Sequence, residues 1–457
     1  MTKKAVKKLK WWQLSILGIG FIIGTGFFLG SSIAIKSAGP GVMITFLLAG
    51  IGTYIVYDAL GRMTAKDPHQ GSFSYYSKKA YGNWAGFSSG WVYWSSEMLI
   101  MGSQMTGISI FTKFWIPNLP LWVFASVYTV LAIMIVLVGI KWFERIGNLF
   151  ALAKLSAIII FIILATLGLF GVFGKGGGVI SWTENLTTFL PNGLTGLWGG
   201  LLFSFYAYGG FEIMSIYAMR LENPKKDALK SGIVMIFLLS AIYLISIGLA
   251  IILVALEQFN MEESPFVIAL SDFQLNFVQH LFNGVLIIAG FSTMTASLFA
   301  VTTMLVNLAK HGNAPKRLVK NKKRKLMLPF PALMVTTSGL ILSIIIGFLL
   351  PNKVYEYITT AAGLMLLYNW IFILYSAKKL LKNTSFDRIK RYIGTILIML
   401  AVTGSLVQPS SRPGFYISLA FLFIIAIITI IMNRKWKSMN GVKMHSSIYQ
   451  VIKNTNK

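Results

Sequence analysis

Hydrophobic residues along this 457-residue chain fall in long uninterrupted runs. Many of the runs reach about 20 residues, the length of helix that crosses the apolar layer of a bilayer. The pattern predicts an all-α membrane protein with twelve transmembrane helices. The expected spans are Leu14–Ala34, Gly41–Leu60, Ala85–Ile110, Leu121–Ile140, Leu149–Phe170, Gly196–Ala218, Gly232–Leu256, Phe282–Leu308, Leu333–Leu350, Val354–Tyr375, Ile393–Val407 and Phe415–Ile431.

Two of these spans are interrupted by closely spaced glycines. The first span contains Gly24 and Gly26, and the sixth contains Gly209 and Gly210. Glycine inside a helix costs about 1 kcal/mol relative to alanine, so these positions indicate backbone that is unwound for a purpose. In secondary transporters such broken helices form the substrate site. Close helix packing through small residues is the alternative explanation.

The two breaks occupy corresponding places if spans one to five and spans six to ten are two halves of the chain. Five spans per half give the halves opposite topologies, which predicts an inverted repeat with broken helices 1 and 6. We expect residues 1–11 to form a basic tail and residues 12–380 the transport core. Residues 381–433 would hold helices 11 and 12, and residues 434–457 a second basic tail.

The net charge of +27 is distributed unevenly along the chain. Thirty-five of the 41 Lys and Arg residues fall in segments on one side of the predicted membrane, and five fall on the other. Basic loops face the cytoplasm, so we expect both termini there and the protein in the plasma membrane. This one-sided pattern reports topology beside membrane lipids, and we expect no nucleic acid partner.

Several kinds of chemistry find no support in the residues. The chain has no cysteine, which excludes disulfides, thiolate metal sites and cysteine nucleophiles. Its four histidines do not have the spacing of metal ligands. The first apolar run has no cleavage motif of a signal peptide and is expected to remain in the protein. We therefore expect no enzyme activity, no cofactor and no metal.

Five short motifs resemble those of the amino acid-polyamine-organocation (APC) transporter superfamily, in order over about the first 320 residues. Spans nine to twelve agree with that family only in number and length. The motifs are Ile23–Gly30, Gly71–Ser72–Phe73 with Tyr75 and Tyr76, Tyr208–Glu212, Glu222–Lys225 and Leu308–Pro315. The chain departs from the family at Arg220, where an acidic residue is common, and at Phe299, where tyrosine is common. The resemblance implies a LeuT-type 5+5 inverted repeat and transport of an amino acid.

An amino acid needs donors for its carboxylate, acceptors for its ammonium and a pocket for its side chain. The free N–H groups of a broken helix suit the carboxylate, and its free carbonyls suit the ammonium. Phe205 and Tyr208 are three residues apart, so one of them can cover the ligand as an aromatic gate, although packing is almost as good an explanation. The expected substrate-binding residues are Ile22, Ile23, Gly24, Thr25, Gly26, Phe205, Tyr208, Gly209 and Gly210.

Lys154 lies in the middle of the fifth span, where an unpaired charge costs about 3 kcal/mol or more. The resemblance implies that this lysine takes the place of the sodium ion of sodium-coupled relatives, near span one and the polar face of span eight. Ser292 and Thr293 are expected to supply that face. Lys154 is then a candidate proton carrier. The alternative is a structural ion pair, or a helix end that lies further inward.

Two carboxylates also fall within spans, Glu97 in span three and Glu212 after the second break. Glu212 matches the glutamate of the family's sixth span, which implies a coupling or gating role. A structural hydrogen bond is an equal alternative. Glu97 is singled out by its depth alone. Gln104 stands where some relatives carry an acidic residue, which argues against a cationic substrate.

These observations predict a secondary transporter that imports an amino acid by proton symport with alternating access. A neutral substrate is expected, and Met98, Met101 and Met105 suit a branched-chain side chain if they face the site. An exchanger or uncoupled facilitator is the main alternative, because Lys154 can be a permanent charge that only holds the site together. A membrane amino acid sensor is a remote one. The oligomeric state is left open.

Overall fold

The computed structural model describes residues 8–138, 140–173, 186–271, 273, 276–310, 312–319, 328–349 and 353–455. Parts of both predicted tails, residues 1–7 and 456–457, lie outside this set, as does His311 of the fifth motif. The α-helices are α1 Trp11–Ile22, α2 Thr25–Phe28, α3 Gly30–Ala38, α4 Val42–Lys66, α5 Ser72–Tyr81, α6 Asn83–Lys113, α7 Leu121–Val138, α8 Ile140–Leu169, α9 Leu186–Phe189, α10 Gly193–Tyr206, α11 Glu212–Tyr217, α12 Pro224–Leu253, α13 Pro265–Ser271, α14 Asn276–Lys310, α15 Phe330–Leu349, α16 Val354–Leu380, α17 Ser385–Val407 and α18 Arg412–Thr455. Short 3₁₀ turns are η1 Gly39–Gly41, η2 Ala218–Arg220, η3 Leu256–Gln258 and η4 Lys316–Val319.

The protein is an all-helical membrane protein, as the hydrophobic runs predict, and each of the twelve apolar stretches overlaps helix. Seven segments of the described chain are long and apolar enough to cross a membrane, and three shorter apolar helices accompany them. The first of the seven, Thr25–Lys66, is divided at Gly39 (φ +60°) and Pro40, where α3 ends and α4 begins.

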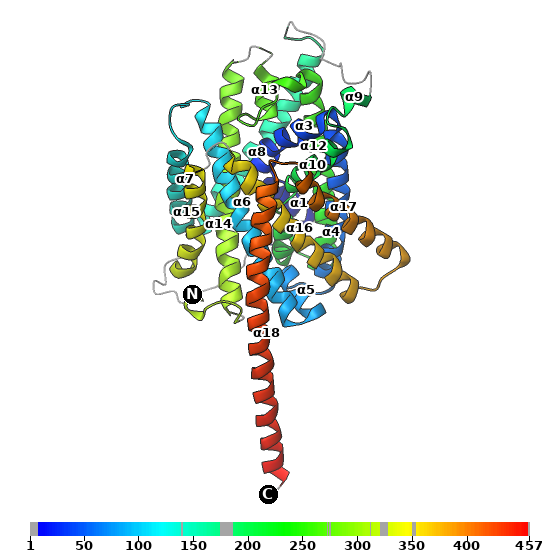
Figure 1. Ribbon diagram of the computed structural model, residues 1–457, viewed down its shortest axis with the longest axis vertical. Helices are drawn as coiled ribbons and strands as arrows, with labels where there is room; N and C mark the ends of the chain where they lie inside the picture. The colour runs from blue at the N-terminus through cyan, green and yellow to red at the C-terminus, as the bar shows by residue number, and fades with distance from the viewer. Residues whose placement is uncertain are drawn as a thin grey trace.

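The long helices form a bundle whose two ends carry different segments (Figure 1). The short helix α5 and the projecting part of α18 lie at one end, and α9 and α13 lie at the other. Helix α18 continues through the second predicted tail as far as Thr455. We name the two ends of the bundle the α5 end and the α13 end.

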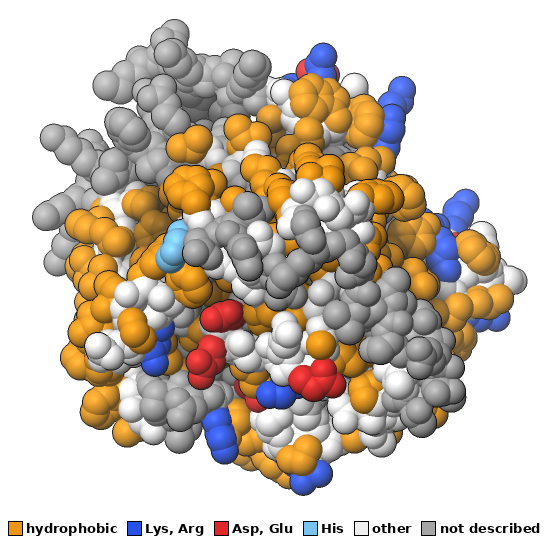
Figure 2. Space-filling model, turned by 90° about the horizontal axis from the view of Figure 1, so that it is seen from above, with side chains coloured by type: hydrophobic (Ala, Val, Ile, Leu, Met, Phe, Trp, Pro, Cys, Tyr) orange, Lys and Arg blue, Asp and Glu red, His pale blue; other side chains and the backbone are white. Residues whose placement is uncertain are grey.

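The α13 end carries acidic side chains near its middle, with Lys or Arg side chains beside them and hydrophobic side chains nearby (Figure 2). Glu257 and Glu262, which belong to the segment between α12 and α13, are exposed at this end. Both side chains are therefore open to solvent. Lys79 and Asp67 form an ion pair of 2.5 Å beside α5 at the opposite end, and the hydrogen bond from Lys79 lowers the pKa of Asp67.

The interior of the bundle is built around α6, which packs against α14 and α16. Helix α4 packs against α12, and α10 packs against α3 and α4. Large aromatic side chains fill the space between these helices. Phe27 from α2 stacks on Tyr243 from α12, with ring centroids 3.9 Å apart. The two broken helices therefore lie inside the bundle, surrounded by continuous ones.

Candidate functional site

The first predicted break lies between α1 and α2. Ile23 and Gly24 have extended backbone (φ −158° and ψ −160° at Gly24), so α1 ends at Ile22 and a new helix starts at Thr25. A helix start leaves its first N–H groups without intrahelical acceptors. The last carbonyls of α1 likewise lack intrahelical donors. The break therefore presents donors and acceptors side by side in the interior.

The second break lies between α10 and α11. Helix α10 ends at Tyr206, residues 207–211 form turns, and α11 begins at Glu212. Gly210 has φ +107°, a backbone conformation that residues with a Cβ rarely adopt, which explains why glycine stands there. Both glycine-marked breaks are thus found where the sequence places them.

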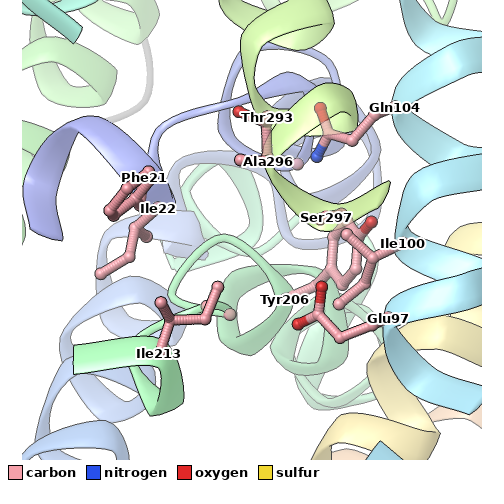
Figure 3. A pocket seen from close by; sticks show the side chains of 13 residues that line it. Phe21, Ile22, Glu97, Ile100, Gln104, Tyr206, Ile213, Thr293, Ala296 and Ser297 are labelled. Atoms are coloured by element: carbon pink, nitrogen blue, oxygen red, sulfur yellow. The ribbon is translucent and has the colours of Figure 1, made fainter. Parts of the chain in front are cut away.

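A small cavity lies between the two breaks (Figure 3). Helix α6 contributes Glu97, Ile100 and Gln104, which are spaced i, i+3 and i+7 and so share one face. The other walls come from α1 and α2, from the second break with α10 and α11, and from α14. Their lining residues are Phe21, Ile22, Gly26, Tyr206, Gly209, Gly210, Ile213, Thr293, Ala296 and Ser297.

At one end of the cavity, the start of α2 is bound by Gln104. The backbone N–H and the hydroxyl of Thr25 both donate to Gln104 Oε1, each at 2.8 Å. Both groups are buried. An amide oxygen therefore occupies the place where a carboxylate would meet the N-terminus of α2. A Cβ on Gly24 would lie 2.9 Å from the same oxygen, so the close approach requires glycine.

Lys154 joins three helices on the other side of the first break. Its side chain is fully buried, and Nζ donates to Gly20 O at 3.0 Å and to Thr293 Oγ1 at 2.8 Å. The Thr293 hydroxyl in turn has two acceptors for its proton, Ile23 O at 3.2 Å and Ala289 O at 3.1 Å. The ammonium thus bridges α8, α1 and α14, in the neighbourhood expected for a sodium substitute. Ser292, expected to share this role, makes no recorded hydrogen bond to Lys154 among the described residues.

Glu212 binds the backbone of the second break. Its carboxylate accepts a hydrogen bond from Gly210 N at 3.1 Å and another from Trp370 Nε1 of α16. The side chain is fully buried. These bonds hold the unwound backbone to a continuous helix, which is a structural contribution. The geometry is equally compatible with the gating role that the sequence suggests.

The structure does not bring Phe205 and Tyr208 to the cavity. The Phe205 ring packs against Trp370 with centroids 5.8 Å apart, and Tyr208 donates to Ser240 at 3.0 Å. Their spacing of three predicts one shared face only within a continuous helix, but α10 ends between them at Tyr206. Tyr206 lines the cavity instead.

Met98, Met101 and Met105 do not line the cavity either. They pack in a separate cluster with residues of α7, α14 and α15. The observation that favoured a branched-chain substrate therefore concerns helix packing. Sequence reasoning also missed Ile100 and Ile213, which are cavity residues. The α6 stripe at positions 97, 100 and 104 is the signal that would have found Ile100.

Two further cavities continue from the first toward the α5 end. The second shares Phe21, Ile213 and Ala296 with the first, and it extends along α14. The third shares Gln70, Gly71, Met304 and Asn307 with the second and is lined by residues of α5. Adjacent cavities with shared lining residues thus follow one another from the two breaks to the α5 end. Within the described residues, no group of His, Asp and Glu could hold a metal ion.

Comparison with known proteins agrees with this arrangement. A family model described as "Amino acid permease" matches residues 13–444. An uncharacterized transporter, YcgH of Bacillus subtilis (strain 168), is 51% identical over 436 residues, which cover 95% of this chain and 97% of that protein. The aromatic amino acid transport protein AroP of Escherichia coli (strain K12) is 29% identical over 447 residues, 95% of this chain and 96% of that protein.

Proposed function

Because this chain belongs to the amino acid permease family, we propose that it imports an amino acid across the plasma membrane by proton symport. Its relatives are transport proteins rather than enzymes. The cavity between two broken helices is the observation that carries the proposal, since it offers buried donors and acceptors next to an apolar pocket.

We further propose the twelve-span LeuT-type architecture with both termini in the cytoplasm. In support, α1–α2 and α10–α11 are broken at corresponding places of two five-span halves, and all twelve apolar stretches overlap helix. The basic loop that contains α5 lies at the end opposite α13, as the charge asymmetry requires. In this orientation the chain of cavities opens toward the cytoplasm.

In the proposed binding mode, the substrate carboxylate meets the start of α2 at Thr25 and Gly26. It replaces the Gln104 oxygen that occupies this place in the structure. The ammonium meets the carbonyls that end α1, around Ile22 and Ile23, and those of the second break near Gly209. The substrate side chain then lies along the α6 face between Gln104 and Glu97. A neutral amino acid remains the proposed substrate class, and the aromatic substrates named for AroP fit within it.

Lys154 is the proposed coupling residue. Its ammonium binds a carbonyl oxygen and a hydroxyl oxygen, the ligand types that a sodium ion would also use. Loss of a proton from this buried site removes the positive charge and one of the three N–H donors, which weakens the hydrogen bond to Gly20 O at the end of α1. Glu212 would act on the second break through Gly210 N. Proton movement and the two broken helices are thereby linked.

An exchanger or facilitator is the second candidate, and one observation favours it. Lys154 and Thr293 hold α8, α1 and α14 together through several hydrogen bonds, an arrangement that a permanent charge would also stabilise. In that case no proton needs to leave the ammonium. The two candidates make different predictions for accumulation.

The test is uptake of each radiolabelled amino acid into proteoliposomes that contain the purified protein, with pH and sodium gradients imposed separately. Accumulation of an amino acid under an inward proton gradient supports symport. A requirement for sodium would contradict the role of Lys154. Uptake only against preloaded amino acid would identify an exchanger, and binding without any uptake would identify a sensor.

A further inference from the structure

Glu97 is a carboxylate at the far end of the cavity from the proposed head-group site. It comes from α6 and points into the cavity, across from Ile213 of α11 (Figure 3). Its side chain is only 1% exposed. The proposed coupling residues do not include it, and the bonds that hold the two breaks do not use it.

Among the described residues, no cation pairs with this carboxylate. None of the ion pairs among the described residues involves Glu97, and its polar neighbours are Tyr93, Ser297 and the second acid Glu212. The hydroxyl of Tyr206, which lines the same cavity, is buried and has no hydrogen-bond partner within the described part of the chain. Buried charges are normally paired with a cation and buried hydroxyls with a hydrogen-bond partner, so the Glu97 carboxylate and the Tyr206 hydroxyl are both available to a donor from a ligand at this end of the cavity.

The distance between the two ends of the cavity sets how long a ligand side chain must be to reach Glu97 from the head-group end. Glu97 and Gln104 are seven residues apart on one helix, which places their backbones roughly 10 Å apart along the axis. Gln104 marks the head-group end through its bonds to Thr25. The side chain of a branched-chain amino acid is too short to reach Glu97 from there, whereas tyrosine, tryptophan or lysine has the required length. Ile100 and Ile213 would flank the apolar part of such a side chain.

We propose that Glu97 is a specificity-determining residue that selects amino acids with long side chains ending in an O–H or N–H donor. This inference rests on the proposed transport function and deepens it. Tyrosine and tryptophan stay within the proposed neutral substrate class. A preference for lysine would widen that class to cations, because Gln104 lies at the head-group end and does not contact the substrate side chain in the proposed binding mode. Tyrosine, tryptophan and lysine share a hydrogen-bond donor that could bind a buried carboxylate. The experiment separates the neutral donors from the cationic one.

The experiment compares uptake of two matched pairs of labelled amino acids by proteoliposomes. Tyrosine and phenylalanine differ by one hydroxyl, and lysine and norleucine differ by one ammonium. We expect the protein to prefer the donor-bearing member of at least one pair by about tenfold or more, the factor that a hydrogen bond to a charged group provides. In the Glu97→Met variant this preference should fall to within about twofold. Glu356→Gln is the control, because Glu356 is a buried acid outside the cavity.

The Glu97→Gln variant supplies a second measurement if Glu97→Met does not fold, as judged by size-exclusion chromatography in detergent. Glutamine keeps an accepting oxygen but no charge, so any preference for lysine should fall at least about tenfold while one for tyrosine falls less. A preference that persists unchanged in both variants would overturn the inference. So would an equal loss of uptake for all four amino acids, which would make Glu97 a general transport residue. Absence of uptake of every amino acid would overturn the transport function itself.

Discussion

Lys154 shows how much one residue can determine in an apolar interior. Its ammonium is fully buried and bonds to Gly20 O and Thr293 Oγ1. Hydrogen bonds from a charged group contribute about 1.5–3 kcal/mol each, so their loss alters the end of α1 strongly. The residue can be found from sequence alone, because a lysine within an apolar run is visible there.

We predict that Lys154→Met lowers proton-driven accumulation by about tenfold or more, because the variant has neither a proton to release nor a donor for Gly20 O. The measurement is accumulation of the identified substrate by proteoliposomes under an inward proton gradient. Lys382→Met is the matched control, since Lys382 is exposed near the start of α17. A Lys154→Met protein that still concentrates substrate would remove this residue from the coupling mechanism.

At the scale of elements, the two helix breaks could be predicted, whereas the contacts that stabilise them could not. Glycine pairs in an apolar run are a local signal, and both breaks occur at them. The bond between Thr25 and Gln104 joins residues 79 positions apart, and that between Glu212 and Trp370 joins residues 158 apart. No local pattern encodes such pairs, because they depend on how α6 and α16 pack against the breaks.

The cavity is lined by Tyr206 and not by the predicted Phe205 and Tyr208, and the cause is similar. Helical spacing predicts the facing of a residue only as far as the helix continues, and α10 ends at Tyr206. The turn that follows redirects Tyr208 toward Ser240. A break that is correctly located therefore still leaves the orientation of its flanking side chains unpredicted.

Trp370 allows a test of the link between α16 and the second break. We predict that Trp370→Phe lowers substrate uptake severalfold, because the buried carboxylate of Glu212 loses its side-chain donor at a cost of about 1–3 kcal/mol. The control is Trp198→Phe, which removes a 2.6 Å bond to Leu400 O between α10 and α17. Melting temperature in detergent should fall in both variants, and uptake should fall only in Trp370→Phe. Equal uptake in the two variants would contradict a functional link.

At the scale of the whole molecule, the row of cavities leads from the breaks to only one of the two ends of the bundle. The cavity at the breaks is followed by two others as far as α5, and the α13 end lies opposite. Alternating access requires a binding site open to one side at a time. In the proposed cycle, the structure is the state whose path leads to the α5 end, and this end faces the cytoplasm in the proposed orientation.

The absence of cysteine from the sequence makes this direction measurable, because a single introduced cysteine is the only thiol. We predict that Ala300→Cys, in the second cavity, reacts with a charged membrane-impermeant maleimide in inside-out vesicles but not in right-side-out vesicles. Lys36→Cys, exposed at the end of α3, should show the opposite pattern. Saturating substrate should slow the labelling of Ala300→Cys, since occupation of the site favours closure of the path. Labelling of Ala300→Cys from the same side as Lys36→Cys would mean that the path opens at the α13 end. Labelling of Ala300→Cys in right-side-out vesicles and of Lys36→Cys in inside-out vesicles would mean that the proposed orientation is reversed.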